Sequence, residues 1–357
     1  MKTTNKFHWI MGVVAMLVSL YAQAYPGESI VLDPVTGNYK ITYWDDTTED
    51  GNGMDIQPRL MRTTFVPATK IIPVIRSKFR MWGASSVAYN YTLSNGASAK
   101  QSIVGLSLEQ IGQIANERDF PPMTATATDI ENVILSNMSA IDSPEDWSGN
   151  IYRVRGQSRV AWSLGDLREN GGVRPGRTVP GFGFTSPALP GISTARMKGI
   201  GAVFGYAGEG PAEDSAIKDE LERLRKNDFV ARPAAIPAIP VPVPFNAATL
   251  LDRIQTQMHT WIAMQLLDAT FSSQLDRYLT AAADAYRHNQ PKAGKEHIET
   301  LRRMLKKEHE DLGRDEEHES DNSQEKNDDK KAKMIDRLAA RVLDFDLKYV
   351  LKRMGDD

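Results

Sequence analysis

The sequence predicts a multidomain protein with an N-terminal all-β sandwich, a Pro-rich linker and a C-terminal all-α small helical bundle. Residues 25–210 consist of short alternating runs that are rich in β-branched and aromatic residues and are separated by Gly, Pro, Asn and Asp, as in antiparallel sandwiches. Residues 246–357 carry apolar side chains at helical spacing. Between the two parts, residues 233–244 contain five prolines, each of which fixes φ and removes a backbone donor.

The first 24 residues have the three parts of a secretory signal peptide. Lys2 and Lys6 precede an apolar run at residues 9–20, and residues 22–24 (Ala-Gln-Ala) form a small-x-small cleavage site. The apolar run is shorter than the roughly 20 residues that a transmembrane helix needs, and no later stretch approaches that length. We therefore expect residues 1–24 to be removed, the mature chain to have no transmembrane segment, and the protein to be secreted or periplasmic.

The composition argues against several classes of function. The chain has 43 Lys and Arg against 46 Asp and Glu, for a net charge of −3, and so mild an acidic balance gives no electrostatic footprint for nucleic acid. The absence of cysteine excludes thiol catalysis, thiolate zinc sites and disulfides. Because a secreted eukaryotic protein of this size more often uses disulfides, the sequence favours a bacterial envelope origin.

The sandwich region contains one strong hairpin signal. Residues 87–93 alternate in polarity, residues 94–96 (Ser-Asn-Gly) are typical of a turn, and residues 102–108 form a second strand-like run. We therefore predict that these two strands pair. Further along, residues 175–176 (Pro-Gly) precede a Gly-Phe-Gly-Phe strand at residues 181–184, and this order resembles the late hairpins of bacterial immunoglobulin-like secreted domains.

A short amphipathic helix is expected within residues 211–231, where three apolar residues recur at helical spacing. The Pro-rich linker follows at residues 232–245. If the twelve residues from 233 to 244 form a polyproline helix, they span roughly 37 Å at about 3.1 Å per residue and hold two domains apart. The isoleucines and valines make this stretch more apolar than expected for a free linker. The alternative is therefore that it lies docked on the β domain.

The helical module, residues 246–357, is expected to contain three or four amphipathic helices with Asn246 as the first N-cap. The turn at residues 289–291 (Asn-Gln-Pro) and the helix that continues with residues 293–298 (Ala-Gly-Lys-Glu-His-Ile) resemble the hairpin of FIMAH domains, small helical modules at the ends of bacterial surface proteins. Residues 308–329 contain eleven Asp or Glu. Such a segment cannot bury enough apolar area to order itself, so we expect a disordered acidic loop.

The distribution of histidine excludes a common hydrolytic mechanism. The mature first half contains none, since all mature histidines follow the Pro-rich stretch. A Ser-His-Asp triad inside the β domain is therefore impossible, and no Gly-x-Ser-x-Gly motif occurs. We assign no catalytic residue and no cofactor-binding residue. His309 and His318 are candidate ligands for a divalent metal ion. The alternative is that the acidic segment around them is solvated and binds no metal.

One acidic loop has the composition of a calcium site. Calcium takes about six to eight oxygen ligands on a chain that bends sharply, and Asp-rich, Gly-containing loops supply both. The candidate ligands are Asp46, Asp50, Asn52 and Asp55. An EF-hand would have Glu where this loop has Gln57, so the alternatives are an irregular calcium loop at a strand end and a hydrophilic hairpin turn. Calcium is the one cofactor that the sequence suggests.

Aromatic residues of the β region are candidates for sugar stacking. They are Trp44, Trp82, Tyr89 and Tyr91. The alternative is that they form core contacts and cross-strand pairs, as aromatic residues on strands commonly do.

The leading hypothesis is a secreted or periplasmic protein without catalysis of its own, which serves binding, adhesion or envelope structure. Its partner would be a cell-surface glycan or an envelope protein, and not nucleic acid. One alternative is an extracellular carbohydrate-active enzyme, a hydrolase or lyase with two carboxylates that face each other in a cleft of the β domain. The other alternative is a calcium-dependent binding module.

Overall fold

The computed structural model describes residues 26–45, 59–83, 85–111, 141–154, 157–165, 171–200, 215–226, 228–310, 312 and 333–355. β-Sheets dominate the N-terminal part of the chain, and the helices that the structure describes lie in the C-terminal part. The chain divides into unit 1, residues 1–66 and 202–227, and unit 2, residues 67–201 and 228–357. This division differs from the predicted boundaries, because the residues that we expected to form one sandwich, 25–210, are shared between the two units.

The described part of unit 1 is a three-stranded antiparallel sheet with one helix, in the strand order β1-β2-β3. The elements are β1 (Ser29–Asp33), β2 (Asn38–Asp45), β3 (Arg59–Phe65) and α2 (Ala216–Lys226). Ile41, Tyr43 and Phe65 of the sheet form one buried cluster with Ile217 and Leu221 of α2. The amphipathic helix expected within residues 211–231 is confirmed, and its apolar stripe covers one face of this sheet.

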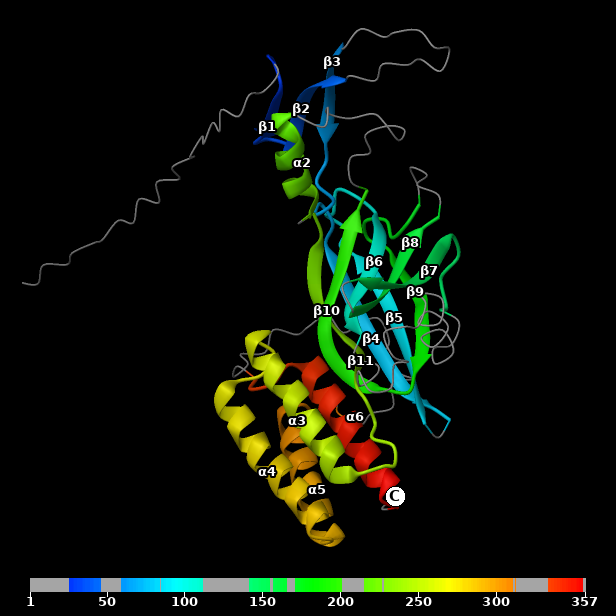
Figure 1. Ribbon diagram of the computed structural model, residues 1–357, viewed down its shortest axis with the longest axis vertical. Helices are drawn as coiled ribbons and strands as arrows, with labels where there is room; N and C mark the ends of the chain where they lie inside the picture. The colour runs from blue at the N-terminus through cyan, green and yellow to red at the C-terminus, as the bar shows by residue number, and fades with distance from the viewer. Residues whose placement is uncertain are drawn as a thin grey trace, which may run out of the picture. The chain divides into compact units, whose positions relative to one another are not determined.

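Unit 2 contains two antiparallel sheets (Figure 1). The first has the order β4-β5-β9, with β4 (Pro73–Trp82), β5 (Ser86–Asn95) and β9 (Thr178–Ser186). The second has the order β11-β10-β6-β8-β7, with β6 (Ile103–Ile111), β7 (Trp147–Val154), β8 (Gln157–Leu164), β10 (Leu189–Gly199) and β11 (Val230–Ile239). Aromatic side chains from both sheets meet between them: the Trp162 ring lies 6.1 Å from Tyr91 and 5.7 Å from Phe182. The two sheets therefore share one core.

The predicted hairpin between residues 87–93 and 102–108 is wrong, although both segments are strands. β5 and β6 lie in different sheets, because Asn95 redirects the chain. Its buried amide donates to the Gln101 and Val173 carbonyl oxygens at 2.7 and 3.0 Å and accepts from the Ile72 N–H at 3.0 Å. These bonds fix the connection that leads from the first sheet to the second.

The proline-rich stretch forms a strand as far as Ile239, and only residues 240–245 remain as a connection to the next helix. β11 is the edge strand of the five-stranded sheet and pairs antiparallel with β10. Its Ala234, Ala235 and Ile236 are completely buried. This corrects the prediction of a Pro-rich linker over residues 232–245 and favours the docked alternative.

Two prolines fit this strand because of their spacing. The Ala235 N–H donates to Ser77 Oγ at 3.1 Å, and the Ala235 carbonyl accepts from the Tyr91 hydroxyl at 2.8 Å. The backbone groups at position 235 therefore point away from β10. Pro233 and Pro237 each lie two residues from Ala235 along the strand. The N–H groups that these prolines lack would therefore also have pointed away from β10.

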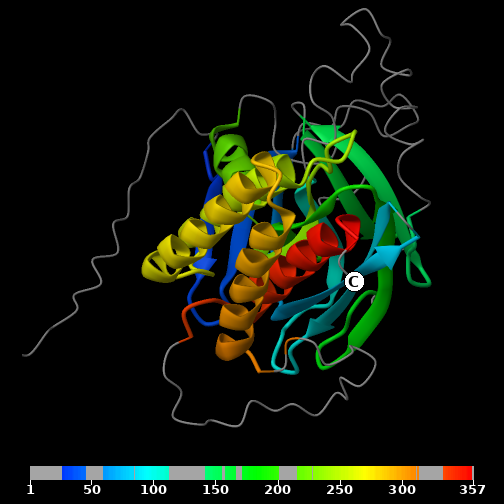
Figure 2. The same cartoon turned by 90° about the horizontal axis from the view of Figure 1, so that it is seen from below.

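Four helices follow β11 among the described residues, as the apolar spacing predicted. They are α3 (Ala247–Ala263), α4 (Ala269–Arg287), α5 (Pro291–Glu308) and α6 (Arg337–Arg353). Asn246 caps α3 by accepting from the Thr249 N–H at 2.9 Å. α3 and α6 contact β10 and β11, and the apolar residues of the helices and of both sheets form one continuous core. The helices are therefore a layer of unit 2 (Figures 1 and 2) and not the separate module that we expected.

Gly191 on β10 marks the closest approach of this layer. A Cβ at Gly191 would lie 2.5 Å from the Ala238 Cβ and 2.9 Å from two side-chain carbons of Gln257 on α3. Gln257 donates to the Ile192 carbonyl at 3.2 Å, and Arg253 donates to the Pro240 carbonyl at 2.6 Å. The absence of a side chain at Gly191 thus lets α3 lie directly on the sheet.

The α4–α5 hairpin turns where the sequence predicts it. Asn289 adopts a positive φ of 55°, a conformation that asparagine tolerates better than most residues. Pro291 begins α5, and the Gly294 position lies against the Tyr286 ring. The predicted acidic loop, residues 308–329, falls almost entirely outside the described residues.

Candidate functional site: a basic strip on strand β4

Strand β4 presents a row of cations on its outward side. Arg76, Lys78, Arg80 and Trp82 are exposed, whereas Ser77 and Phe79, which alternate with them, are buried. This is the period of two that a strand imposes on a sheet with one face in the core. We call the four exposed residues the β4 strip. Over six residues at about 3.3 Å each, the strip is roughly 20 Å long.

The neighbouring strand adds polar but uncharged groups to the strip. In the β4–β5 ladder, Arg76 lies opposite Thr92, and Lys78 lies opposite Asn90. The outward sides of β4 and β5, whose residues are all described, carry no carboxylate. Asp142 pairs through the backbone with Gly183 of β9, and its carboxylate lies on the same side as Asn90: a Cβ at Gly183 would be 3.0 Å from Asn90 Oδ1 and 3.5 Å from Asp142 Oδ2. β4 and β5 themselves therefore contribute only positive charge to the strip, while Arg76 and Lys78 each also interact with a partner elsewhere in the structure.

Trp82 is the aromatic member of the strip. It is 58% exposed, the largest exposed fraction among the described tryptophan side chains. The Arg80 Cζ lies 5.8 Å from the centre of the indole ring, within the range of a cation–π contact. The Arg80 guanidinium therefore lies over one face of the exposed indole.

Tyr89 and Tyr91, two of the predicted sugar-stacking residues, belong to the core. Each is 1% exposed, and their hydroxyls donate to the Ala188 and Ala235 carbonyl oxygens, both at 2.8 Å. Burial raises the pKa of both tyrosines well above the usual value. The sugar-stacking prediction is therefore wrong for these two residues, because the inward side of β5 faces the second sheet.

Trp44, the remaining predicted stacking residue, lies in unit 1 on β2. Its ring is partly buried, and its Nε1 donates to the Pro26 carbonyl at 3.0 Å. The Trp44 N–H donates to Glu28 at 3.2 Å. These contacts give Trp44 a structural role in holding the first described residues against the sheet.

The predicted calcium ligands Asp46, Asp50, Asn52 and Asp55 all lie outside the described residues, so calcium binding there stays a prediction. Within the described part of the chain, no group of three or more acidic or histidine side chains is arranged to hold a metal ion.

His309 does not have a free ring nitrogen for the metal site that we considered. It is 2% exposed; its Nε2 lies 2.9 Å from the Ile335 carbonyl, and its Nδ1 lies 3.1 Å from the Lys333 Nζ. Because the Ile335 carbonyl only accepts and the Lys333 ammonium only donates, Nε2 acts as the donor and Nδ1 as the acceptor. The ring therefore links the end of α5 to the residues before α6. His318 lies outside the described residues.

A carboxylate in the second sheet is engaged by arginines. Glu109 on β6 accepts from Arg159 on β8 at 2.7 Å and from Arg196 on β10 at 2.8 Å. The Arg196 guanidinium also lies over the Phe229 ring, 4.2 Å from its centre. This cross-strand arrangement uses the charge of Glu109 to connect three strands.

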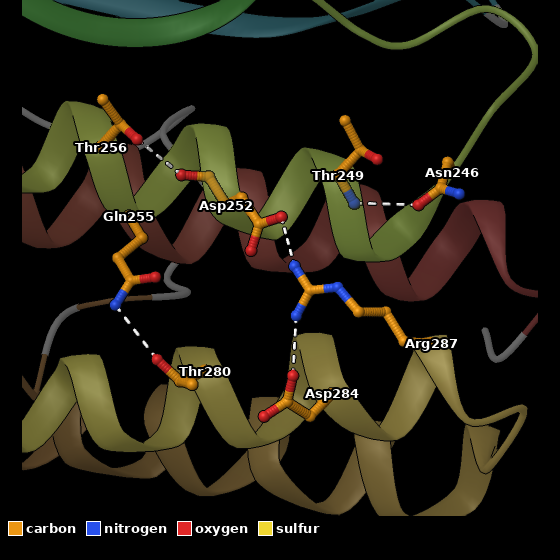
Figure 3. Close-up of polar contacts among 8 residues, drawn as sticks. All are labelled: Asn246, Thr249, Asp252, Gln255, Thr256, Thr280, Asp284 and Arg287. Atoms are coloured by element: carbon orange, nitrogen blue, oxygen red, sulfur yellow. Dashed lines mark hydrogen bonds and ion pairs between the residues drawn. The ribbon is translucent and has the colours of Figure 1, made fainter.

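The seam between α3 and α4 is a second polar cluster (Figure 3). Arg287 of α4 reaches Asp252 of α3 and also Asp284 one turn earlier on its own helix, the latter at 2.7 Å. Hydrogen bonds to the two carboxylates, above all to Asp252, raise the pKa of Arg287. Gln255 crosses the same seam to Thr280 at 3.2 Å. The Arg287–Asp252 and Gln255–Thr280 contacts join the two helices, and Asp284 holds Arg287 in place from its own helix, so we assign the cluster a structural role.

No helix in the described part of the chain is long and apolar enough to cross a membrane.

Comparison with known proteins yields little. No protein-family model matches the chain, and no curated protein matches it. Among solved structures, the chain is similar to an uncharacterized protein from Nocardia farcinica whose crystal structure reveals an immunoglobulin-like fold. That similarity has 10% identity and a TM-score of 0.23, and it covers 39% of this chain and 91% of the other. A TM-score this low carries no weight for the function of this chain.

Proposed function

We propose that this protein is a secreted or periplasmic, non-catalytic binding protein, and that it binds an acidic polysaccharide along the β4 strip. One observation carries the proposal: three cations and an exposed indole stand in a single row on the outward side of β4. The signal-peptide pattern of residues 1–24 supports the location.

The chemistry of the strip suits a charged sugar polymer. The apolar face of a sugar ring stacks on an indole, and Trp82 is exposed enough to offer one. The guanidinium groups of Arg76 and Arg80 match the geometry of carboxylate, phosphate or sulfate oxygens in a bidentate way, and Lys78 adds a point charge. Because alternate residues on a strand are about 6.6 Å apart, the cations form a regular series that a repeating anion can follow.

The finer family assignments are also proposals. An immunoglobulin-like class for the sheets of unit 2 is supported by two antiparallel sheets around one aromatic core. A FIMAH-like origin for the α4–α5 hairpin is supported by its turn at Asn289 and by the contact of Gly294 with Tyr286.

The proposal is tested by measuring binding of the full mature protein to polygalacturonate and to its fully methyl-esterified form, which has the same sugar backbone without the charge. We expect the protein to bind the acidic polymer with an affinity that falls as salt is added. Salt screens interactions between exposed charges, with a Debye length of about 10 Å at 0.1 M. Equal binding to both polymers would contradict the electrostatic part of the proposal.

Variants test the site itself. If the ligand covers one face of Trp82, burial of about 50–80 Å² at about 25 cal/mol per Å² predicts a loss of about 1–2 kcal/mol for Trp82→Ala, or roughly 5- to 30-fold in Kd. Arg80→Ala should weaken binding and reduce its salt dependence. Lys292→Ala, which removes one exposed positive charge at the start of α5, is the control and should leave Kd unchanged. Equal affinities for all variants, or binding to anionic phospholipid vesicles but not to the acidic polymer, would refute the proposal.

A further inference from the structure

Helix α6 carries two aspartates that stand two residues apart in opposite environments. Asp344 is buried and has two cationic partners: it accepts from Arg302 of α5 at 2.8 Å and from Lys348 one turn later at 2.8 Å. Asp346 is completely buried, and neither of its oxygens has a hydrogen-bond partner among the described residues. A spacing of two residues turns the side chain by about 200° around a helix, so the two carboxyls point in different directions.

The surroundings of Asp346 are apolar. The residues one turn before and after it on the same side of α6 are Val342, Leu343, Tyr349 and Val350, and all are buried. Its sequence neighbour Phe345 packs edge-on against Phe79 of β4, with ring centres 5.1 Å apart. Asp346 therefore lies within the interface between the helical layer and the sheets.

Among the described residues, no charged group on the elements packed against α6 forms a hydrogen bond with Asp346. Tyr89 of β5 has an electrostatic interaction with Asp346, but its hydroxyl is donated to the Ala188 carbonyl. Arg302 of α5 is bonded to Asp344, and Arg341 of α6 lies over the Phe79 ring. α3 buries only apolar residues, and β10 and β11 contribute apolar residues to the same core.

We propose that Asp346 makes the packing of the helical layer sensitive to pH: α6 stays packed against the sheets while the Asp346 carboxyl is protonated, and it loosens when the carboxyl ionises. An ionised carboxylate without partners is far costlier to bury than a neutral carboxyl. The charge can be accommodated only if water reaches it, and this requires α6 to move away from the sheets.

The direction of the pH dependence follows from burial. Burial raises the pKa of Asp346 well above its usual value. In the unfolded chain this carboxyl loses its proton at about pH 4, whereas in the docked state it keeps the proton to higher pH. The docked state therefore binds more protons than the unfolded state above about pH 4, and its stability falls as pH rises. The unfolding equilibrium constant should increase about tenfold per pH unit until the pH reaches the pKa of the docked state.

The test compares the full chain with Asp346→Leu, Asp346→Asn and Asp344→Asn variants by urea unfolding between pH 5 and pH 8. The ratio of the wild-type unfolding constant to that of Asp346→Leu should grow about tenfold per pH unit over the first part of this range. Leucine keeps the volume and removes the polar group, so this variant should fold; Asp346→Asn shows whether loss of the charge alone is sufficient. Asp344→Asn is the matched control: it removes a carboxyl of the same helix that has two cationic partners, and it should not reproduce the pH-dependent effect of Asp346→Leu.

Hydrogen exchange locates the effect. Protection factors of the α6 amides, corrected for the intrinsic pH dependence of exchange, should fall with rising pH in the wild type and stay constant in Asp346→Leu. Parallel pH profiles for the wild type and Asp346→Leu, in either unfolding or protection, would overturn the proposal.

Discussion

The contact of α3 with Gly191 provides a sharp test of the docked helical layer. Gly191→Ala would place a Cβ 2.5 Å from the Ala238 Cβ, closer than real Cβ contacts, and 2.9 Å from Gln257. The Gln257 side chain can move, but the Ala238 Cβ is fixed to the backbone of β11. Forcing an extra methyl group into such a packed site costs about 1–3 kcal/mol of unfolding free energy. Gly191→Val should cost more than the alanine variant.

The assay is urea unfolding followed both by helical circular dichroism and by tryptophan fluorescence. Because the helices share a core with the sheets, both signals should report one transition, and Gly191→Ala should shift both together. Gly165→Ala is the control, since its Cβ would meet the Asp146 carbonyl oxygen and Ser148 Oγ at ordinary distances of 3.5 and 3.9 Å. Two separate wild-type transitions, or a Gly191→Ala variant within about 0.5 kcal/mol of wild type, would refute the docked arrangement.

Two further variants probe the connections between the sheets. Asn95→Ala removes three side-chain hydrogen bonds in a buried site and should cost about 3 kcal/mol or more in thermal or urea unfolding; Asn90→Ala, exposed on the same strand, should stay within about 0.5 kcal/mol. Tyr91→Phe leaves the Ala235 carbonyl without its donor and should cost about 1–3 kcal/mol, whereas Tyr278→Phe on α4 should change little. An Asn95 variant as stable as the Asn90 variant, or equal effects of the two tyrosine changes, would contradict these assignments.

Local elements were predictable from the sequence, but strand partners were not. The alternation of residues 87–93 identified β5 correctly, because periodicity depends on one buried face. It could not show that β5 pairs with β4 and β9 and not with β6. That choice depends on the Asn95 side chain, whose bonds reach residues 72 and 173, far apart in the sequence. An Asn-Gly turn between two apolar runs has the same local appearance whether the chain turns within one sheet or crosses to another.

The sequence contains a signal for the candidate site in the alternation of cations along one strand, which the aromatic residues alone do not show. Residues 76–82 alternate cations with Ser77, Phe79 and Met81 and end at Trp82, which is the pattern of a strand with a charged outer side. The alternation that placed Tyr89 and Tyr91 on one apolar side already favoured the core for both. Whether a given aromatic faces solvent depends on which sheet covers it, and a single strand does not contain that information.

In the proline-rich segment, the even spacing of two prolines allows a strand to form where a linker was predicted. Prolines at every position would have excluded a ladder, but Pro233 and Pro237 are four residues apart and leave the N–H groups of Ala234 and Ile236 available to face β10. The backbone groups of Ala235 point away from β10 and bond instead to side chains of the other sheet: its N–H donates to Ser77 Oγ, and its carbonyl accepts from the Tyr91 hydroxyl. Apolar residues between evenly spaced prolines therefore indicate an edge strand that side chains cover. The same covering explains why the helices cannot form an independent module: the strand that leads into α3 is itself part of the core on which α3 and α6 pack.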